Sequence, residues 1–422
     1  MKSLILSLTL LLFASGAALA QDASPLSDQG IGAFTTYAGG RSAGMGNAGL
    51  AMTGNGYLNR LNPATWGGLE HVQITGTYDF AGVSSTDNSL NTSSYNANGN
   101  FGGGIFALPV DRDLGISIAG GFTPFSSYGY KLASSDSVTN ISGSGYGVDR
   151  TGSGGLGEAF FGGSVSPFPE LSIGLMFQYA FGRTEAVTSM NFQNSAYQGS
   201  YIDNSMYLRG SGETVGITLG KFDVLTGAKF LSGITLAGYY RTRYSLVGTS
   251  ETHSIYSDGF DTVFTLTAQG YIPPEYGIGV AKTFDNGLSA VLDLRTQQLS
   301  KYYDSFTPAG TLKDALFLGG GVQYLQGKDI GSLFAKRVLR AGFYYAKTQF
   351  SLPTKSGGQK QVDELFFTAG IEFPISYSAS MDVGAQYGFR GLSSDFLLHE
   401  RIFRLYVSFS MGETWFIRSM GD

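Results

Sequence analysis

The sequence of 422 residues contains 27 Lys and Arg against 32 Asp and Glu, which gives a net charge of −5. No basic stripe stands out, so nucleic acid is not an expected partner, and the absence of cysteine excludes a disulfide framework and a lipid-modified cysteine. Charged residues make up only 14% of the chain, aromatic residues make up 14%, and glycine occupies 62 positions. This balance suits a β-barrel with lipid outside and small residues at crowded positions.

Residues 1–20 predict a signal peptide. Lys2 gives a basic start, the stretch from Leu4 to Phe13 is apolar, and Ala18-Leu19-Ala20 supplies the small residues that signal peptidase requires. A membrane anchor is the alternative interpretation, but the apolar run is short and ends in small residues. We expect the mature chain to begin near Gln21.

The remaining sequence contains no run of about eighteen apolar residues, which excludes membrane-spanning helices. If the mature chain crosses a membrane, it must do so as a closed β-barrel. Only closure leaves every backbone N–H and C=O group paired in lipid.

Residues 21–70 predict a hatch, a segment that plugs a lumen, instead of a strand. Glycine recurs from Gly39 to Gly49 without strand alternation, and glycine permits positive φ and close backbone approach in a narrow space. Asn62-Pro63-Ala64 predicts the start of a helix, because Asn caps helices and Pro favours the first helical position.

Residues 71–412 predict an all-β fold, a transmembrane antiparallel β-barrel of about fourteen strands. The clearest strand runs from Leu171 to Gly182, where apolar residues alternate strictly with small or polar ones. The expected strands cover residues 71–84, 99–110, 113–130, 156–167, 170–185, 205–222, 231–248, 262–284, 287–300, 313–326, 337–351, 362–374, 377–390 and 401–412.

The connections between these strands alternate between short and long. Those after the second, fourth, eighth and twelfth strands are tight, whereas those after odd-numbered strands run to roughly ten to twenty-five residues. Outer-membrane barrels have this asymmetry, with short periplasmic turns and long external loops. Two connections after even-numbered strands, around 223–230 and 327–336, are longer than a tight turn. Pro273-Pro274 predicts a bulge, a kink or a strand start, and 413–422 are expected to form a periplasmic tail.

A soluble β-sandwich could show the same alternation. Two features favour the barrel. The expected strands are often about ten to fifteen residues long, where globular strands are usually near six. Their polar faces are rich in Gly, Ser and Gln and poor in Lys and Glu, which suits a lumen better than a freely solvated face.

The glycine-rich stretch, the Asn-Pro-Ala triplet and the strand that follows resemble the FadL/TodX family of outer-membrane long-chain fatty-acid transporters. The resemblance implies a fourteen-stranded barrel occluded by an N-terminal hatch, and passive diffusion of hydrophobic compounds across the outer membrane. A FadL-like sister group that serves protein secretion to the cell surface shares the same features. The hatch-motif positions are Arg41, Gly44, Gly46, Asn62, Pro63 and Ala64.

Several charged residues fall on the polar faces of the expected strands. Arg241, Arg295, Arg390 and Arg404 are candidates for binding a ligand carboxylate in the lumen, because the guanidinium fork forms two hydrogen bonds with a carboxylate. Salt-bridged wall contacts and hatch anchoring are the plainer interpretation of these four. The other charged residues on these faces are Arg243, Asp293, Glu372 and Asp382.

Tyrosines near the strand ends are most simply interfacial girdles. They are Tyr128, Tyr130, Tyr239, Tyr240, Tyr302 and Tyr303.

No catalytic site, metal site or cofactor is expected. The residue types from Gly152 to Gly157 match the dinucleotide-binding fingerprint. That fingerprint binds a dinucleotide only where it opens a helix, whereas here it opens an expected strand. His71, His253 and His399 lack metal-ligand spacing and form no convincing triad with a serine.

We therefore predict an outer-membrane protein of a Gram-negative bacterium that admits small hydrophobic compounds, such as long-chain fatty acids, by passive diffusion through a hatch-plugged barrel. The alternatives are an accessory barrel for secretion or surface attachment of proteins, and a general porin. The expected partners are outer-membrane lipid, a hydrophobic or amphiphilic small-molecule ligand, and the barrel-assembly machinery.

Overall fold

The computed structural model describes residues 24–35, 39–53, 58–87, 92–137, 145–194, 199–256, 261–326, 337–376 and 378–413. The predicted signal peptide lies outside these residues. So does the predicted tail, apart from Glu413, which ends the last strand.

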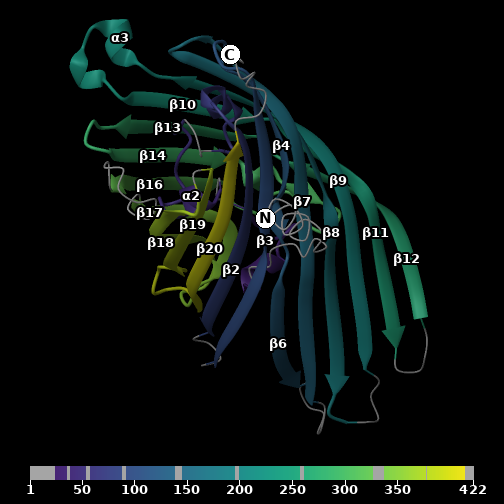
Figure 1. The fold of residues 1–422 in the computed structure, drawn as a ribbon. Helices are drawn as coiled ribbons and strands as arrows, with labels where there is room; N and C mark the ends of the chain where they lie inside the picture. The colour runs from purple at the N-terminus through teal and green to yellow at the C-terminus, as the bar shows by residue number, and fades with distance from the viewer. Residues whose placement is uncertain are drawn as a thin grey trace.

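The described strands form a closed antiparallel barrel of 14 strands (Figure 1), which confirms the predicted fold class. Three of the fourteen are interrupted, so that β4 continues as β6, β10 as β11 and β12 as β13. The wall strands are β2 (Val72–Asp87), β3 (Thr92–Asp111), β4 (Ile116–Pro124), β6 (Tyr130–Ser137), β7 (Gly145–Phe168), β8 (Leu171–Phe192), β9 (Ser200–Leu219), β10 (Ile234–Arg241), β11 (Tyr244–Tyr256), β12 (Asp261–Ile272), β13 (Glu275–Thr283), β14 (Leu288–Gln297), β16 (Ala315–Gln326), β17 (Arg337–Pro353), β18 (Gln359–Pro374), β19 (Ala379–Arg390) and β20 (Leu398–Glu413).

The first and last strands close the barrel, because β2 pairs with β20 from Val72 opposite Glu413 to Asp87 opposite Leu398. Short elements occupy the interior and the rims. They are η1 (Pro25–Asp28), β1 (Ala33–Phe34), α2 (Gly40–Ala43), η2 (Pro63–Gly68), β5 (Ser126–Ser127), α3 (Phe222–Thr226), η3 (Lys229–Leu231), η4 (Leu299–Lys301) and β15 (Tyr303–Asp304). Among the described residues, no helix is long and apolar enough to span a membrane.

The strand faces follow the predicted phase. On β8, Phe177 is 56% exposed on the outside, whereas Met176 is 1% and Gln178 is 4% exposed on the inside. β20 repeats the pattern, with Phe403 outside and Arg404 inside. Apolar side chains cover the outer surface, as they do on barrels that face lipid, while polar groups find hydrogen-bond partners in the lumen.

Several strands are much longer than the sequence predicted. β7 has 24 residues and β8 has 22, so much of what the pattern assigned to long loops is paired hairpin. The reason is physical: alternation is visible only where one face lies against lipid. Beyond that level both faces are polar, yet the backbone ladder continues.

Pro273-Pro274 separates β12 from β13, which confirms the predicted interruption. A second break, at Thr242 and Arg243, separates β10 from β11 and shifts the side-chain phase. Arg241 and Tyr244 both face inward, so Arg243 is exposed and the prediction that it lies on the polar inner face was wrong.

The girdle prediction was wrong for four of the six tyrosines. Tyr240 and Tyr303 are exposed on the outer surface, whereas Tyr128, Tyr130, Tyr239 and Tyr302 are buried. The inward direction of Tyr128, Tyr130 and Tyr302 follows from the kinked wall and from the η4 turn, neither of which is visible in the sequence pattern. Tyr239 lies two residues before the inward-facing Arg241 on β10, so its direction follows from the alternation itself.

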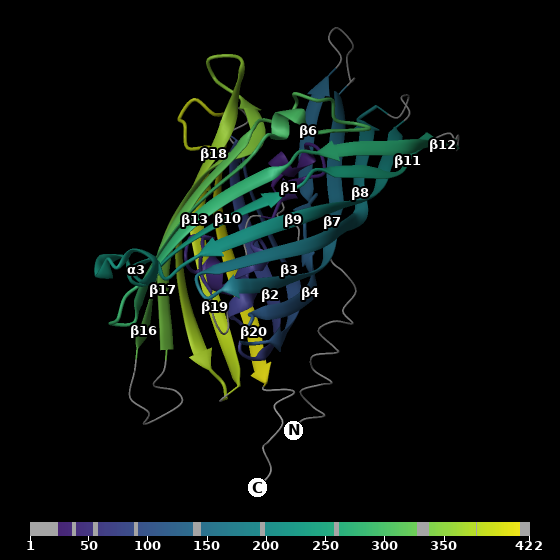
Figure 2. The same cartoon turned by 90° about the horizontal axis from the view of Figure 1, so that it is seen from above.

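The N-terminal segment, defined as the described residues between 24 and 71, lies within the ring of strands (Figure 2). Trp66 of η2 is fully buried, and it packs in one cluster with Phe160 and Met176 of the wall. Met45 and Leu50 form another cluster with Tyr239 and Val291. The interior is therefore filled by this segment, with wall side chains packed around it.

Candidate ligand cavity and N-terminal segment

The glycines of the hatch motif allow the N-terminal segment to touch the wall. Gly46 has a φ of +66°, and a Cβ there would lie 2.1 Å from the carbonyl oxygen of Phe343. A Cβ at Gly44 would lie 3.0 Å from the Cα of Gly370. The backbone N–H of Gly46 donates to Oγ1 of Thr368 over 2.8 Å. At these two positions a side chain would push the segment off the wall.

Arg41 joins a cluster of four charges between α2 and the wall. Its Nη2 lies 2.6 Å from Oε2 of Glu372, and its Nε lies 3.8 Å from Oδ1 of Asp382. Arg340 of β17 bridges the same two carboxylates. Glu372 and Asp382, which the sequence placed on polar strand faces, therefore hold the N-terminal segment in place.

Asn62, Pro63 and Ala64 act as the sequence predicted. Oδ1 of Asn62 accepts the backbone N–H of Ala64 over 3.1 Å and Pro63 begins η2, which confirms the capped helix start. The carbonyl of Ala64 accepts a 2.7 Å hydrogen bond from Oγ of Ser172 in β8. The triplet thus caps a helix and fastens it to the wall.

Two further contacts fasten the segment. The carboxylate of Asp293 accepts the backbone N–H groups of Gly49 and Leu50 at 2.7 and 2.9 Å. Nη1 of Arg60 lies 3.1 Å from Oε1 of Glu158, and both side chains are buried. Sequence reasoning missed this last pair. The one indication of it in the sequence was Glu158, an acidic residue on the inward-facing side of a glycine-rich expected strand.

All four candidate arginines line one cavity in the lumen, of about 100 Å³. The structure thus brings together Arg241, Arg295, Arg390 and Arg404, which come from β10, β14, β19 and β20. The cationic residues around the cavity are these four and Lys347, against two acids, Glu275 and Glu364. The apolar and aromatic lining includes Ala33, Phe34, Leu299, Phe317, Ala346 and Phe350.

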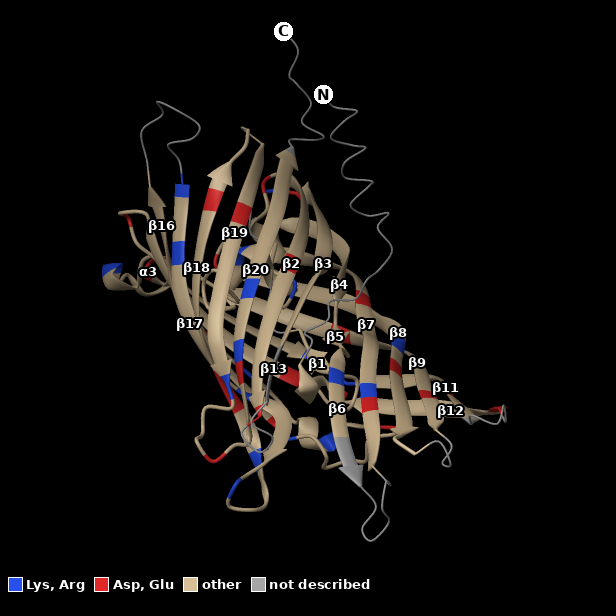
Figure 3. Ribbon diagram, turned by 90° about the horizontal axis from the view of Figure 1, so that it is seen from below, with Lys and Arg blue, Asp and Glu red and all other residues tan. Residues whose placement is uncertain are grey.

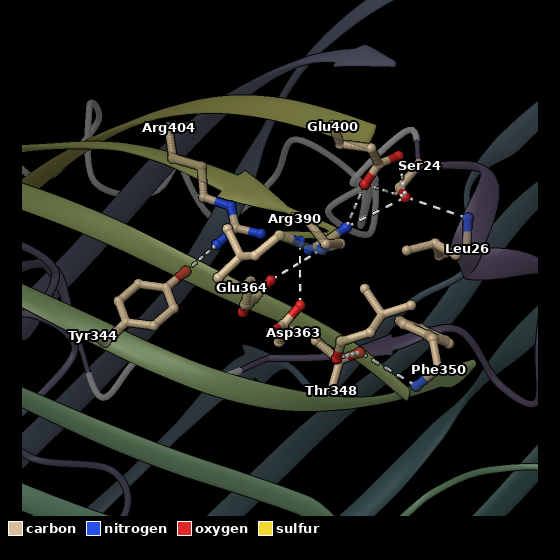
Figure 4. A network of polar contacts seen from close by, with 12 residues as sticks. Ser24, Leu26, Tyr344, Thr348, Phe350, Asp363, Glu364, Arg390, Glu400 and Arg404 are labelled. Carbon is tan, nitrogen blue, oxygen red and sulfur yellow. Dashed lines mark hydrogen bonds and ion pairs between the residues drawn. The ribbon is translucent and has the colours of Figure 1, made fainter. Parts of the chain in front are cut away.

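Arg390 links this cavity to the start of the N-terminal segment (Figure 4). Its Nε lies 2.9 Å from Glu364 and its Nη1 lies 3.0 Å from Glu400. The hydroxyl of Ser24 donates to Glu400 over 2.8 Å. Arg390 of the cavity and Ser24, the residue before η1, therefore both bind the carboxylate of Glu400.

The other three arginines divide into two kinds. Arg241 forms an ion pair with Glu275. Arg295 lies over the ring of Phe317, with 3.7 Å between the guanidinium carbon and the ring centroid. Arg404 lies 4.8 Å from the Phe366 centroid and donates to the hydroxyl of Tyr344 over 2.9 Å. Guanidinium groups on aromatic faces next to apolar side chains suit an anionic head with an apolar tail.

β3 and β4 pair over part of their length beside the N-terminal segment. In the described part of the chain, β3 pairs with β4 only from Gly104 to Asp111, although β3 begins at Thr92. After Pro124 the chain turns inward, and Ser126 and Ser127 pair with Phe34 and Ala33 of the N-terminal segment. A small cavity of about 40 Å³ lies here, lined by Gly102, Gly103 and Thr123 of the wall and by Arg41 and Leu58 of the segment.

The described residues contain no group of three or more His, Asp or Glu that could hold a metal ion. His71 lies before β2 and His399 lies in β20, next to Leu398, which pairs with the far end of β2. These two histidines therefore lie at opposite rims.

The fold and the site define a class: a closed fourteen-stranded antiparallel barrel with a filled lumen and an inner cavity of mixed cationic and aromatic lining. Comparison with protein-family models identifies the family. The BamG family model matches residues 1–420, so the chain belongs to the BamG family, a sister group of the FadL/TodX barrels. A search of curated proteins gives no match.

Solved structures with this fold include hydrocarbon transporters. The toluene transporter TodX of P. putida is 15% identical with a TM-score of 0.60, over 90% of this chain and 99% of that chain. The toluene transporter TbuX of Ralstonia pickettii is 14% identical with a TM-score of 0.59, over 89% and 98%. A Pseudomonas aeruginosa FadL homologue is 12% identical with a TM-score of 0.57, over 90% and 99%. The expected resemblance to the FadL/TodX type is thereby confirmed for the fold.

Proposed function

We propose that the protein is an outer-membrane channel that admits small hydrophobic or amphiphilic molecules by passive diffusion. The observation that carries the proposal is the lumen cavity, where four arginines from four different strands meet beside aromatic and aliphatic side chains. An amphiphile with a carboxylate head fits this lining. TodX and TbuX, whose fold the chain shares, are toluene transporters.

The N-terminal segment limits the route that a ligand can take. The N-terminal segment fills the lumen and would block a steady aqueous path, so a ligand would leave the cavity by movement of this segment or through the wall. Outer-membrane lipid, an amphiphilic ligand and the barrel-assembly machinery remain the expected partners.

The test compares uptake of a matched acid and an uncharged hydrocarbon in proteoliposomes. Arg295→Met and Arg404→Met should weaken acid uptake by roughly tenfold to a hundredfold, because a charge-assisted hydrogen bond contributes about 1.5–3 kcal/mol. Hydrocarbon uptake should be unchanged. Arg241→Met and Arg390→Met should also lower thermal stability, because each leaves a buried acid without its cation.

Arg183→Met is the matched control, because Arg183 lies on the exposed face of β8 and pairs with Glu185. Equal losses for the acid and the hydrocarbon in every cavity variant would contradict carboxylate binding. Recovery of the protein from the soluble periplasm would contradict the outer-membrane assignment.

A second function, accessory service to protein secretion or surface attachment, has one observation in its favour. β12 pairs with β11 along its length, but on its other side, among the residues that the structure describes, β12 pairs with β15 only at Gly270 and Tyr271. Phe264 and Leu266 on this edge strand are exposed. An unpaired apolar edge can accept a strand of another protein. Affinity purification that recovers a stable protein partner would favour this function over the channel.

A further inference from the structure

The connection between β9 and β10 differs from the other turns at its rim that the structure describes. We define the β9–β10 excursion as residues 220–233, which contain α3 and η3. The next turn at this rim, between β13 and β14, spans only residues 284–287 and includes Asp285 and Asn286. The excursion instead presents Val224, Leu225 and Phe230, which are 67%, 55% and 76% exposed.

Hydrogen bonds fix the excursion in one shape. The N–H of Gly227, which has a φ of +73°, caps α3 by donating to the carbonyl of Asp223 over 2.8 Å. The hydroxyl of Thr226 donates to the carbonyl of Phe222. Nζ of Lys282 on β13 donates to the carbonyl of Phe230 over 2.7 Å. An ordered backbone therefore holds three large apolar side chains outward.

The excursion lies at the edge of the apolar outer surface of the barrel. α3 stands out sideways from the barrel wall, beyond the end of β10 (Figures 1 and 2). The outer faces of the adjoining strands carry exposed apolar residues up to this rim, so the apolar surface of the excursion continues the lipid-facing surface of the barrel. These residues are Val215, Ile217, Leu236 and Ile278.

The charges suit a phosphate-bearing surface. Lys221 precedes Val224 and Leu225, and Lys229 directly precedes Phe230; both lysines are exposed. Lys282 on β13 donates to the carbonyl of Phe230. Figure 3 shows blue at the outer end of the loop that carries α3. Within the excursion, two lysines stand against one acid, Asp223. Lys282, Asp285 and Glu170 lie on the adjoining strand and turns, and the carbonyl of Glu170 accepts the N–H of Gly220. Interfacial segments combine apolar side chains among the acyl chains with lysines at the head groups.

We propose that the β9–β10 excursion docks on the membrane leaflet at the short-turn rim and binds an anionic phospholipid head group. Lys221 and Lys229 contact the phosphate, while Val224, Leu225 and Phe230 insert among the acyl chains. Anchors of this kind fix the depth and tilt of a membrane-spanning element. This binding site is independent of the lumen cavity and of the ligand that the cavity takes.

The experiment uses Phe230→Trp in the full chain, reconstituted in phosphatidylcholine vesicles that contain brominated lipid. Bromine quenches the new indole only on contact, and the parent protein supplies the background from its native tryptophans. We expect brominated phosphatidylglycerol to quench at lower mole fraction than brominated phosphatidylcholine. In Lys221→Gln/Lys229→Gln this preference for phosphatidylglycerol should disappear, because each lysine contributes about fivefold to it. Both brominated lipids should still quench the indole of this variant.

Lys355→Gln/Lys360→Gln removes the same charge at the opposite rim, from the β17–β18 turn and the start of β18, and should keep the preference. Heat-modifiable migration checks that each barrel is folded, and Leu225→Trp is a second reporter if the first does not fold. Quenching of the indole by aqueous iodide but not by any brominated lipid would overturn the proposal, because it would place the excursion in water. A phosphatidylglycerol preference that survives loss of both lysines would overturn the head-group contact.

Discussion

Replacing Arg60 with methionine should release the N-terminal segment from the wall. Arg60 and Glu158 face each other across the boundary between segment and barrel, with 3.1 Å between their charged atoms and with 4% and 0% of their side chains exposed. Methionine fills a similar volume but carries no charge. The carboxylate of Glu158 then keeps the hydroxyl of Tyr244, which donates to it over 2.7 Å, and the nearby charge of Arg241.

The magnitude follows from burial. Removing one partner of a buried ion pair costs about 3–5 kcal/mol, because the remaining charge is left uncompensated. The hydrogen bond from Tyr244 places Arg60→Met near the lower end of that range. When the N-terminal segment leaves the wall, water solvates the carboxylate of Glu158, so the cost of burying its uncompensated charge applies only to the attached state. The equilibrium constant for unseating should therefore rise by roughly a hundredfold, since about 1.4 kcal/mol is a factor of ten.

Planar-bilayer recordings measure this directly, because an unseated segment opens an aqueous path. We expect the fraction of time in conducting states to rise in Arg60→Met and to fall back in Arg60→Met/Glu158→Gln, where no charge remains to compensate. The double variant makes the comparison a coupling cycle. A conductance in Arg60→Met equal to that of the native protein, or additive effects in the double variant, would refute the reasoning.

Three other predictions concern the same segment. Deletion of residues 22–70 should leave an inserted barrel with greatly increased steady conductance, and unchanged conductance would show that the segment is not a plug. Gly46→Ala should lower the thermal unfolding midpoint by several degrees, because a Cβ would clash with the Phe343 carbonyl at a φ of +66°; a normal midpoint would contradict that contact. Burial raises the pKa of Asp28 from 3.8 to about 6, although the positive charge of Arg150 opposes the shift. Attachment of the N-terminal segment inside the barrel should therefore be strongest below pH about 4. It should weaken by on the order of 2–3 kcal/mol as the pH rises from about 4 through about 6. Asp28→Asn should remove this pH dependence of conductance, and an unaltered dependence would assign it to another group.

The strand-bearing part of the chain is determined largely by local sequence. A barrel strand in lipid must place apolar groups on one face and polar or small groups on the other, so the alternation at Leu171–Gly182 and around Phe403 specified both the strand and its direction. The helix start at Asn62 and Pro63 is equally local, because capping involves neighbouring residues. Inward placement of the four arginines follows from the same alternation.

Contacts between distant parts of the chain were decided only by the tertiary structure. Arg60 and Glu158 are 98 positions apart, and Ser24 and Glu400 are 376 apart. No periodicity connects such residues. They meet because closure of β2 against β20 folds the wall around the N-terminal segment.

The breaks in the wall explain where the sequence pattern failed. Two residues between β10 and β11 shift the phase, which turned Arg243 outward, and the inward turn after Pro124 buried Tyr128 and Tyr130. Each strand taken alone obeys a period of two. Where a strand is interrupted, its direction afterwards depends on the neighbours with which it pairs. The sequence by itself therefore determined the barrel and its two faces, whereas the cavity and the attachment of the N-terminal segment depend on pairing across the closed wall.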